Sequence, residues 1–314
     1  LDALAPAHKR RLQDAAVVGK VFWAGAVAAL DEAGSDDLER ELRELERREL
    51  IRRERKSSAQ GETEYAFRHV LTRDVAYAQI PRAERSERHR RAAEWIASLG
   101  RPEDRAELLA QHYLAALEYA RAAGGDVIAF TTPALTALGQ AGERASALGA
   151  YKAAARYLET ALELASDDDR ERGQLLYHYG TALYWGENGG EQALREAVTR
   201  LRRLDPETAA RAALWLSRAA WFRADHAANR EWLTEADRLL ADRPDSIVQT
   251  AALVERSTIE MTASEYDQAI QSAREALRRI EHSGRPDLLI RAFNVIGVSR
   301  VALGDEGGMD DQRR

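Results

Sequence analysis

Cysteine is absent from the 314 residues of this sequence. The chain therefore forms neither disulfide bonds nor thiolate metal sites, which fits a reducing compartment, and we expect a cytoplasmic protein. Long apolar runs are absent too. The longest, residues 15–30, is interrupted by Lys20 and is shorter than the roughly 20 apolar residues that a membrane span needs. With no recognisable signal peptide at its start, the chain is not expected to contact a membrane.

A strongly basic domain is also lacking. Residues 1–100 carry 19 Lys and Arg against 18 Asp and Glu, and the rest of the chain carries 27 against 34. Proteins that bind nucleic acids are usually basic on at least one domain, because neutralising phosphates supplies most of their affinity. The basic run at residues 47–56 follows a segment in which acidic residues alternate with Arg. DNA is therefore not an expected partner of this segment.

Catalytic and metal-binding motifs are missing as well. A phosphate-binding loop reads Gly-x4-Gly-Lys-Ser/Thr, but Gly19-Lys20 is followed by Val21. Neither His-Glu-x-x-His nor Gly-x-Ser-x-Gly occurs. Acidic runs such as residues 167–169 fall at expected helix starts, where carboxylates cap free N–H groups. We expect no catalytic residue, no metal site and no cofactor held by this segment itself.

From about residue 133 the sequence contains a repeat. Ala- and Leu-rich helical stretches come in pairs, and the first stretch of each pair carries a small residue: Gly142, Gly180, Ser217, Ser257 and Gly297. The intervals are 38, 37, 40 and 40 residues. Small residues allow the two helices of a pair to approach closely. Turn-forming segments at residues 166–169, 205–206, 243–245 and 284–287 separate the pairs.

This pattern resembles the tetratricopeptide repeat, whose period is about 34 residues. Residues 149–161 and 266–277 carry its small-x-aromatic and Ala-x3-large features, whereas Asn229 stands where the pattern has Ala. The resemblance covers residues 133–305 and implies a solenoid of helical hairpins. The fifth unit has its first helix, residues 288–303, without a second. We therefore expect a truncated last repeat, with an exposed apolar face, in a fragment of a larger protein.

Residues 1–99 have a different pattern. Residues 50–53 and 64–67 flank a polar, Gly-containing segment, which predicts a β-hairpin. Helical spacing resumes after it, so His69 is expected in the first turn of a helix. The free N–H groups and the positive end of the helix dipole at that place favour an anion such as a phosphate.

Residues 1–99 also resemble the winged-helix module of signal-transduction ATPases with numerous domains. The landmarks are residues 12–19, Phe22-Trp23 and residues 45–51, 65–69 and 82–89. In better-known members a Met-His-Asp motif at this junction places its His on the β-phosphate of ADP, which an upstream domain binds. The resemblance makes His69, with its neighbour Arg68, the candidate phosphate sensor. Only the His is matched, because Phe67-Arg68 precedes it and Val70 replaces the Asp. A local structural role for His69 is the alternative.

The predicted fold class is all-α. It comprises a winged-helix domain with a small β-hairpin wing at residues 1–99, a bridging helix and linker at 100–132, and a tetratricopeptide-like solenoid at 133–314. The first helices of such hairpins line the concave surface. Four aromatic residues at the ends of first helices are therefore candidate partner-binding residues: Tyr184, Trp185, Trp221 and Phe222. Most other aromatics, and His89 and His112, are expected to pack in the core.

The resemblance implies a non-catalytic regulatory segment. A winged helix would gate a nucleotide switch, with ATP or ADP in an upstream nucleotide-binding domain of the same polypeptide, and the array would bind a protein or peptide. Residues 67–69, 82–89 and 111–113 look most like bacterial proteins that join an adenylate or guanylate cyclase to such an ATPase and repeats. Two alternatives stay open: a transcription regulator of the same ATPase class, and a free-standing scaffold without nucleotide linkage.

Overall fold

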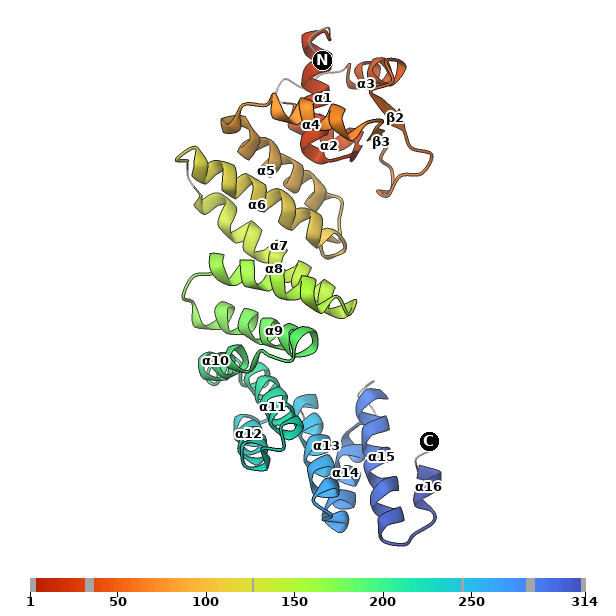
Figure 1. Ribbon diagram of the computed structural model, residues 1–314, viewed down its shortest axis with the longest axis vertical. Helices are drawn as coiled ribbons and strands as arrows, with labels where there is room; N and C mark the ends of the chain where they lie inside the picture. The colour runs from red at the N-terminus through yellow and green to blue at the C-terminus, as the bar shows by residue number, and fades with distance from the viewer. Residues whose placement is uncertain (1–3, 32–36, 126, 244–245, 281–285, 312–314) are drawn as a thin grey trace. The chain divides into compact units, whose positions relative to one another are not determined.

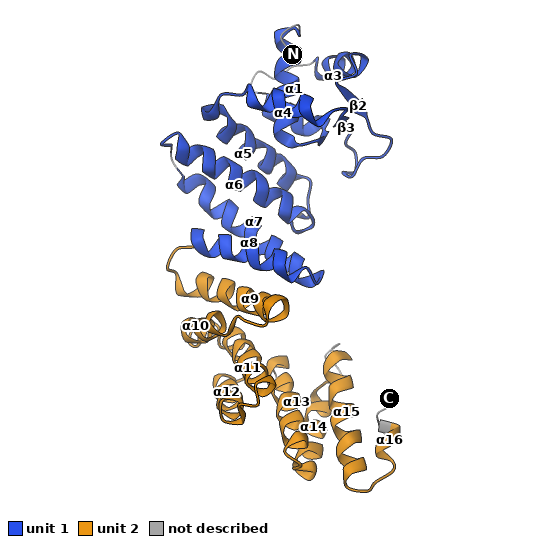
Figure 2. Cartoon of the chain, viewed as in Figure 1, with its two compact units in different colours: residues 1–164 blue, residues 165–314 orange. Residues whose placement is uncertain are grey.

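The computed structural model describes residues 4–31, 37–125, 127–243, 246–280 and 286–311 (Figure 1). Most of these residues are helical. The chain divides into two compact units, residues 1–164 and 165–314 (Figure 2). This division falls inside the predicted repeat array and not at its start. The predicted domain limits at residues 99 and 132 stay predictions.

The first unit begins with helices around a small sheet. Its first seven elements are α1 (Pro6–Val18), β1 (Val21–Trp23), α2 (Ala24–Leu30), α3 (Leu38–Arg47), β2 (Ile51–Arg53), β3 (Glu64–Phe67) and α4 (Val70–Ala78). Strand β3 pairs antiparallel with both other strands, with Val21 opposite Ala66 and Ile51 opposite Phe67. The predicted hairpin is thus confirmed. The sequence pattern does not predict strand β1, because its three residues lie in a continuous apolar stretch and show no alternation of apolar and polar residues.

Four longer helices complete the first unit. They are α5 (Arg82–Ser98), α6 (Ala106–Ala122), α7 (Ile128–Ala147) and α8 (Tyr151–Leu164), and each packs against the next. A short 3-10 turn, η1 (Pro102–Arg105), precedes α6. The predicted bridging helix is α6. Because α7 begins at Ile128, the predicted linker contains the start of the following helix.

Buried charges join the helices at the beginning of this unit. Arg11 on α1 donates to Glu41 of α3 at 2.5 Å and to Asp31 after α2 at 2.6 Å. Asp14 accepts from Arg88 of α5 at 2.9 Å. Burial raises the pKa of Asp14 to about 6, although Arg88 and Arg11 favour its charged form. Removing one member would leave a buried charge without compensation, so these contacts restrict how α1, α3 and α5 pack.

The second unit consists of helical hairpins. Helix α9 (Asp169–Glu187) pairs with α10 (Glu191–Leu201), α11 (Pro206–Phe222) with α12 (His226–Leu239), and α13 (Ile247–Thr262) with α14 (Tyr266–Ile280); α15 (Pro286–Ala302) and the short α16 (Gly308–Asp311) follow. Asp168 caps the start of α9 through its carboxylate, as predicted. Asp205, predicted only as part of a turn, caps the start of α11 in the same way. Parts of the later predicted turns, residues 244–245 and 284–285, lie outside the described residues.

Small residues set the distance between the two helices of a hairpin. A Cβ atom at Gly180 would lie 2.7 Å from Cγ of Leu194 and 3.1 Å from the carbonyl oxygen of Gly190. Ser217 is fully buried, and the side-chain amide of Asn229 on the facing helix donates to its hydroxyl oxygen at 2.9 Å. Because a buried hydroxyl needs a hydrogen-bond partner, Asn in place of Ala suits a serine at this position. The predicted close approach is confirmed.

The substitution Gly180→Val should lower the free energy of unfolding by about 1–3 kcal/mol, because an overpacked site must move its neighbours. Gly189→Val is the matched control, since an added Cβ at Gly189 has no atom within 4 Å. Its effect should stay within about 0.5 kcal/mol. Urea unfolding followed by circular dichroism measures both variants. Equal effects of the two would contradict a close-packed seam at Gly180.

Candidate functional site

The first candidate site lies where β3 leads into α4. His69 occupies the position before the helix and not its first turn, because its backbone is extended and not helical (φ −127°, ψ 131°). Its side chain makes no capping hydrogen bond, and both Arg68 and His69 are exposed. The Arg68 guanidinium is 4.0 Å from a carboxylate oxygen of Glu49. The junction thus offers an uncapped helix start to an anion, and the ADP-sensing role of both residues stays a prediction.

Helix α4 carries exposed apolar side chains next to this junction. Val70, Leu71 and Val75 are 46, 77 and 48% exposed. Apolar side chains gathered on one exposed surface are typical of contact sites. The junction therefore combines a cation, a histidine and an apolar helix face.

A buried polar network ties α4 to α5 and α6. The hydroxyl of Tyr77 lies 2.8 Å from Nε2 of His89 and donates to the hydroxyl of Tyr119 at 3.1 Å. The Nδ1 atoms of His89 and His112 are 2.9 Å apart, so one of them carries the proton that the other accepts. Burial lowers the pKa of His89 to about 3 and the pKa of His112 to about 4, and the cation of Arg73 adds to both shifts. The predicted packing role of the two histidines is confirmed.

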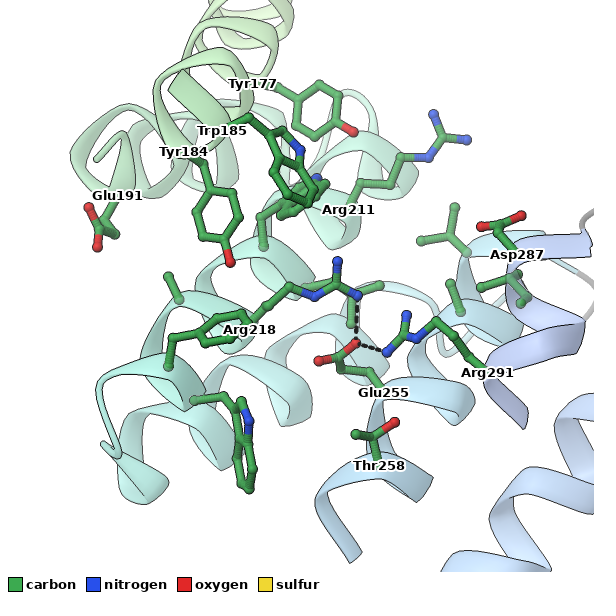
Figure 3. A pocket seen from close by; sticks show the side chains of 18 of the residues that line it. Tyr177, Tyr184, Trp185, Glu191, Arg211, Arg218, Glu255, Thr258, Asp287 and Arg291 are labelled. Atoms are coloured by element: carbon green, nitrogen blue, oxygen red, sulfur yellow. Dashed lines mark hydrogen bonds and ion pairs between the residues drawn. The ribbon is translucent and has the colours of Figure 1, made fainter. Parts of the chain in front are cut away.

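The second candidate site is a cavity of about 1250 Å³ within the second unit (Figure 3). It is formed by α9, α11, α13 and α15, the first helix of each hairpin. Six aromatic side chains line it: Tyr177, Tyr184, Trp185, Trp215, Trp221 and Phe222. The structure thus brings together all four residues predicted to contact a partner. Their binding role stays a prediction.

Three of these aromatic rings form one cluster. The ring centroids of Tyr184 and Trp215 are 5.0 Å apart, and those of Trp185 and Trp215 are 5.6 Å apart with planes at 82°. The guanidinium carbon of Arg218 lies 5.0 Å from the centroid of Trp215. Edge-to-face contacts and a cation over an indole are both favourable arrangements. They hold this wall of the cavity in place without a ligand.

Charged side chains complete the lining. Glu255 on α13 accepts hydrogen bonds at Oε2 from Arg218 of α11, at 3.0 Å, and from Arg291 of α15, at 2.6 Å (Figure 3). Arg211 and Asp287 also line the cavity, as do Arg223 and Glu191, which form an ion pair with each other. Two guanidinium groups therefore share one carboxylate oxygen inside the cavity.

No motif in the sequence points to these charged residues. On α11, Arg211, Trp215, Arg218 and Phe222 follow one another at intervals of four, three and four residues, which places them on one face of the helix. The opposite side of α11 buries mostly Ala. A stripe of Arg and aromatic residues on a helix whose remaining face is Ala is the signal that could have identified the cavity.

The basic run at residues 47–56 pairs with carboxylates of its own region. Arg47 and Arg48 both contact Glu44, at 2.6 and 3.0 Å, and Arg52 contacts Glu54 at 2.9 Å. The described residues contain no group of three or more His, Cys, Asp or Glu that could hold a metal ion. No helix among them combines the length and the apolarity needed to cross a membrane.

Comparisons with known proteins return distant structural likenesses and no sequence relatives. No protein-family model and no curated protein matches the chain. Among solved structures, the MamA protein is similar at 19% identity and a TM-score of 0.40, over 57% of this chain and 88% of that one. A signal transduction ATPase with numerous domains (STAND) protein with a tetratricopeptide repeat sensor, from Pyrococcus horikoshii, is similar at 14% identity and a TM-score of 0.49. That match covers 99% of this chain and 56% of the archaeal protein.

Acidification from pH 7 to pH 5 should lower the free energy of unfolding of the first unit by about 3 kcal/mol. The unfolded chain protonates His89 and His112 near pH 6.5, whereas the folded pKa values are about 3 and 4, so each costs about 2 kcal/mol over this range. Asp14 acts in the opposite direction, because a raised folded pKa of about 6 adds about 1 kcal/mol on acidification. Urea unfolding at the two pH values measures the sum.

An NMR titration of the ring protons tests the same claim without any substitution. Signals of two of the seven histidines are expected not to shift down to about pH 5. Titration of all seven near pH 6.5 would show that the buried pair is not held neutral.

Proposed function

We propose that the chain is a non-catalytic regulatory segment whose second unit binds a protein partner in the cavity between α9, α11, α13 and α15. The observation that carries this proposal is the lining itself, six aromatic side chains and several arginines around one cavity. Trp, Tyr and Arg are the residue types that supply most binding energy at protein interfaces. Trp185 and Phe222 are 52 and 75% exposed, so a partner would remove large apolar surfaces from water.

The size of the cavity favours a peptide segment over a small molecule. Pockets for small molecules and cofactors usually measure about 300–1,000 Å³, whereas this cavity has about 1250 Å³. It also extends over four helices, so an occupant meets several separate side-chain positions. An extended or helical segment of a protein suits such a surface.

We further propose that the first unit contains a winged-helix module that contacts an upstream nucleotide-binding domain in the same polypeptide. The order of α1, β1, α2, α3, β2 and β3 and the pairing of β3 with both other strands support this. The exposure of Arg68 and His69 beside the apolar face of α4 supports it as well. In this proposal His69 approaches a phosphate of ADP, and ligand binding to the second unit shifts the population of the switch.

The identity of the parent protein rests on the sequence resemblance alone, which favours a cyclase-linked ATPase over a transcription regulator of the same class or a free-standing scaffold. The proposed cytoplasmic location rests on the absence of cysteine. A cyclase or a helix-turn-helix domain in the neighbouring coding sequence distinguishes the first two. ADP carried by the longer polypeptide excludes the third.

Peptides selected from a random library displayed on phage should bind the cavity, and Trp185→Ala and Phe222→Ala should each weaken their binding at least about tenfold. Loss of a central aromatic anchor costs more than about 1.4 kcal/mol, which is a tenfold change in Kd. Fluorescence anisotropy of a labelled selected peptide measures the Kd.

Ile290→Ala is the matched control for these variants. Ile290 lies on α15, is 64% exposed and does not line the cavity, so its truncation should leave the Kd unchanged. Equal weakening by all three variants would indicate a general surface effect. Peptides whose binding ignores Trp185 and Phe222 would disprove the cavity as the binding site.

Joined to its native upstream sequence, the chain should retain ADP through purification, and His69→Ala should lose most of it because the phosphate loses a charged or hydrogen-bonding contact. Denaturing the purified protein and quantifying the released nucleotide measures this. His226→Ala, an exposed histidine of the second unit, should retain ADP like the wild type. Equal ADP in the wild type and the His69 variant would leave His69 with a structural role only.

A further inference from the structure

The side chains that line the cavity carry one net positive charge, because four arginines (Arg211, Arg218, Arg223 and Arg291) outnumber three acidic residues (Glu191, Glu255 and Asp287). Arg218 and Arg291 share the single carboxylate of Glu255. The three side chains together therefore carry one net positive charge. Arg211 lines the same cavity, and it forms no ion pair with any residue that the structure describes.

Both guanidinium groups also keep unused hydrogen-bond donors. A guanidinium has five N–H donors in one plane. Among the described residues, Arg218 and Arg291 each use a single nitrogen, Nη2, for Glu255. The side chain of Glu255 is only 9% exposed, whereas those of Arg218 and Arg291 are 28 and 34% exposed. The carboxylate is therefore buried while donors remain accessible from the cavity (Figure 3).

The surroundings limit how much negative charge a ligand can bring. Residues 165–314 carry 21 basic residues, all of them Arg, against 26 acidic ones. A strongly acidic partner would be repelled by this unit before it reached the cavity. A single acidic group beside the three arginines would neutralise the local positive charge without being repelled by the unit as a whole.

The aromatic wall lies next to the arginines. The guanidinium of Arg218 lies over the ring of Trp215, whose centroid is 5.0 Å from that of Tyr184 and 5.6 Å from that of Trp185. A ligand carboxylate at Arg218 would therefore place its neighbouring side chain against indole and phenol rings. An aromatic or aliphatic side chain suits that position, because it buries apolar area there.

We infer that the cavity selects a peptide segment of a partner protein in which one Asp or Glu stands beside an aromatic or aliphatic residue. This inference rests on the proposed binding function and adds the chemistry of its ligand. Glu255 sets the strength of the preference. It orients Arg218 and Arg291 and cancels one of their two charges, so the ligand carboxylate becomes the second anion of the cluster.

A charge series at this cluster tests the inference. The full chain selects from a random peptide library, and one selected peptide is synthesised in two forms, with its acidic residue and with the amide Gln or Asn in its place. Kd values for both are measured on the wild type, Glu255→Gln and Arg291→Gln. These variants change the charge of the cluster from one to two and to zero, respectively.

The acidic peptide should bind about tenfold more tightly to Glu255→Gln and about tenfold more weakly to Arg291→Gln, as expected for a close charge pair. The Kd of the amide form should differ by no more than about twofold among the three proteins, because its amide has no charge that interacts with the cluster. It also serves as the control for an intact cavity. If Arg291→Gln binds neither form of the peptide, the affinity of Glu255→Gln for the acidic peptide decides whether the inference holds.

The remaining outcomes separate this inference from the proposed function. Selected peptides that depend on Trp185 but lack Asp and Glu, or whose Kd ignores the charge series, overturn the inference and leave the binding function in place. A phosphoserine form that binds more than about tenfold tighter than the Glu form overturns the assignment to a single carboxylate. A library that yields no peptide dependent on Trp185 overturns both.

Discussion

Close approach of the paired helices in residues 165–314 is the constraint on which the candidate binding surface depends. Gly180 and Ser217 allow almost no space between the helices of their hairpins. Helix α11 accordingly buries mostly Ala on the side that faces its neighbours. Bulky side chains find no room there, so Trp215 and Phe222 lie on the other face of the helix. The packing that holds the hairpins together thus also produces an aromatic-lined cavity.

Much of the fold follows from the sequence because its determinants are local. Recurring small residues, helix-capping Asp residues such as Asp168 and Asp205, and the polar turn between residues 53 and 64 act within a few residues of the structure they specify. Strand β1 lacks such a signal, because its pairing partner β3 lies more than 40 residues further along the chain. The division at residue 164 likewise depends on contacts that only the folded chain reveals.

The candidate site is predictable only in part. The aromatic pairs at residues 184–185 and 221–222 are visible in the sequence, since their position at the end of a first helix points them to a shared surface. The role of Glu255 cannot be predicted from the sequence, because a single Glu in a helical stretch looks like any solvent-exposed residue. Its importance comes from Arg218 and Arg291, which lie on two other helices. In the same way, the low pKa values of His89 and His112 arise from burial by separate helices.

The aromatic wall has an optical consequence. Three of the six tryptophans of the chain line the cavity, namely Trp185, Trp215 and Trp221. The ring centroids of Trp185 and Trp215 are 5.6 Å apart. Indole emission depends on contact with water and on nearby charges, and Trp185 is half exposed while Trp215 lies beneath the Arg218 cation. Any molecule that enters the cavity replaces that water. Binding in the cavity should therefore change the intrinsic tryptophan fluorescence of the protein, so occupancy can be followed in solution without a label.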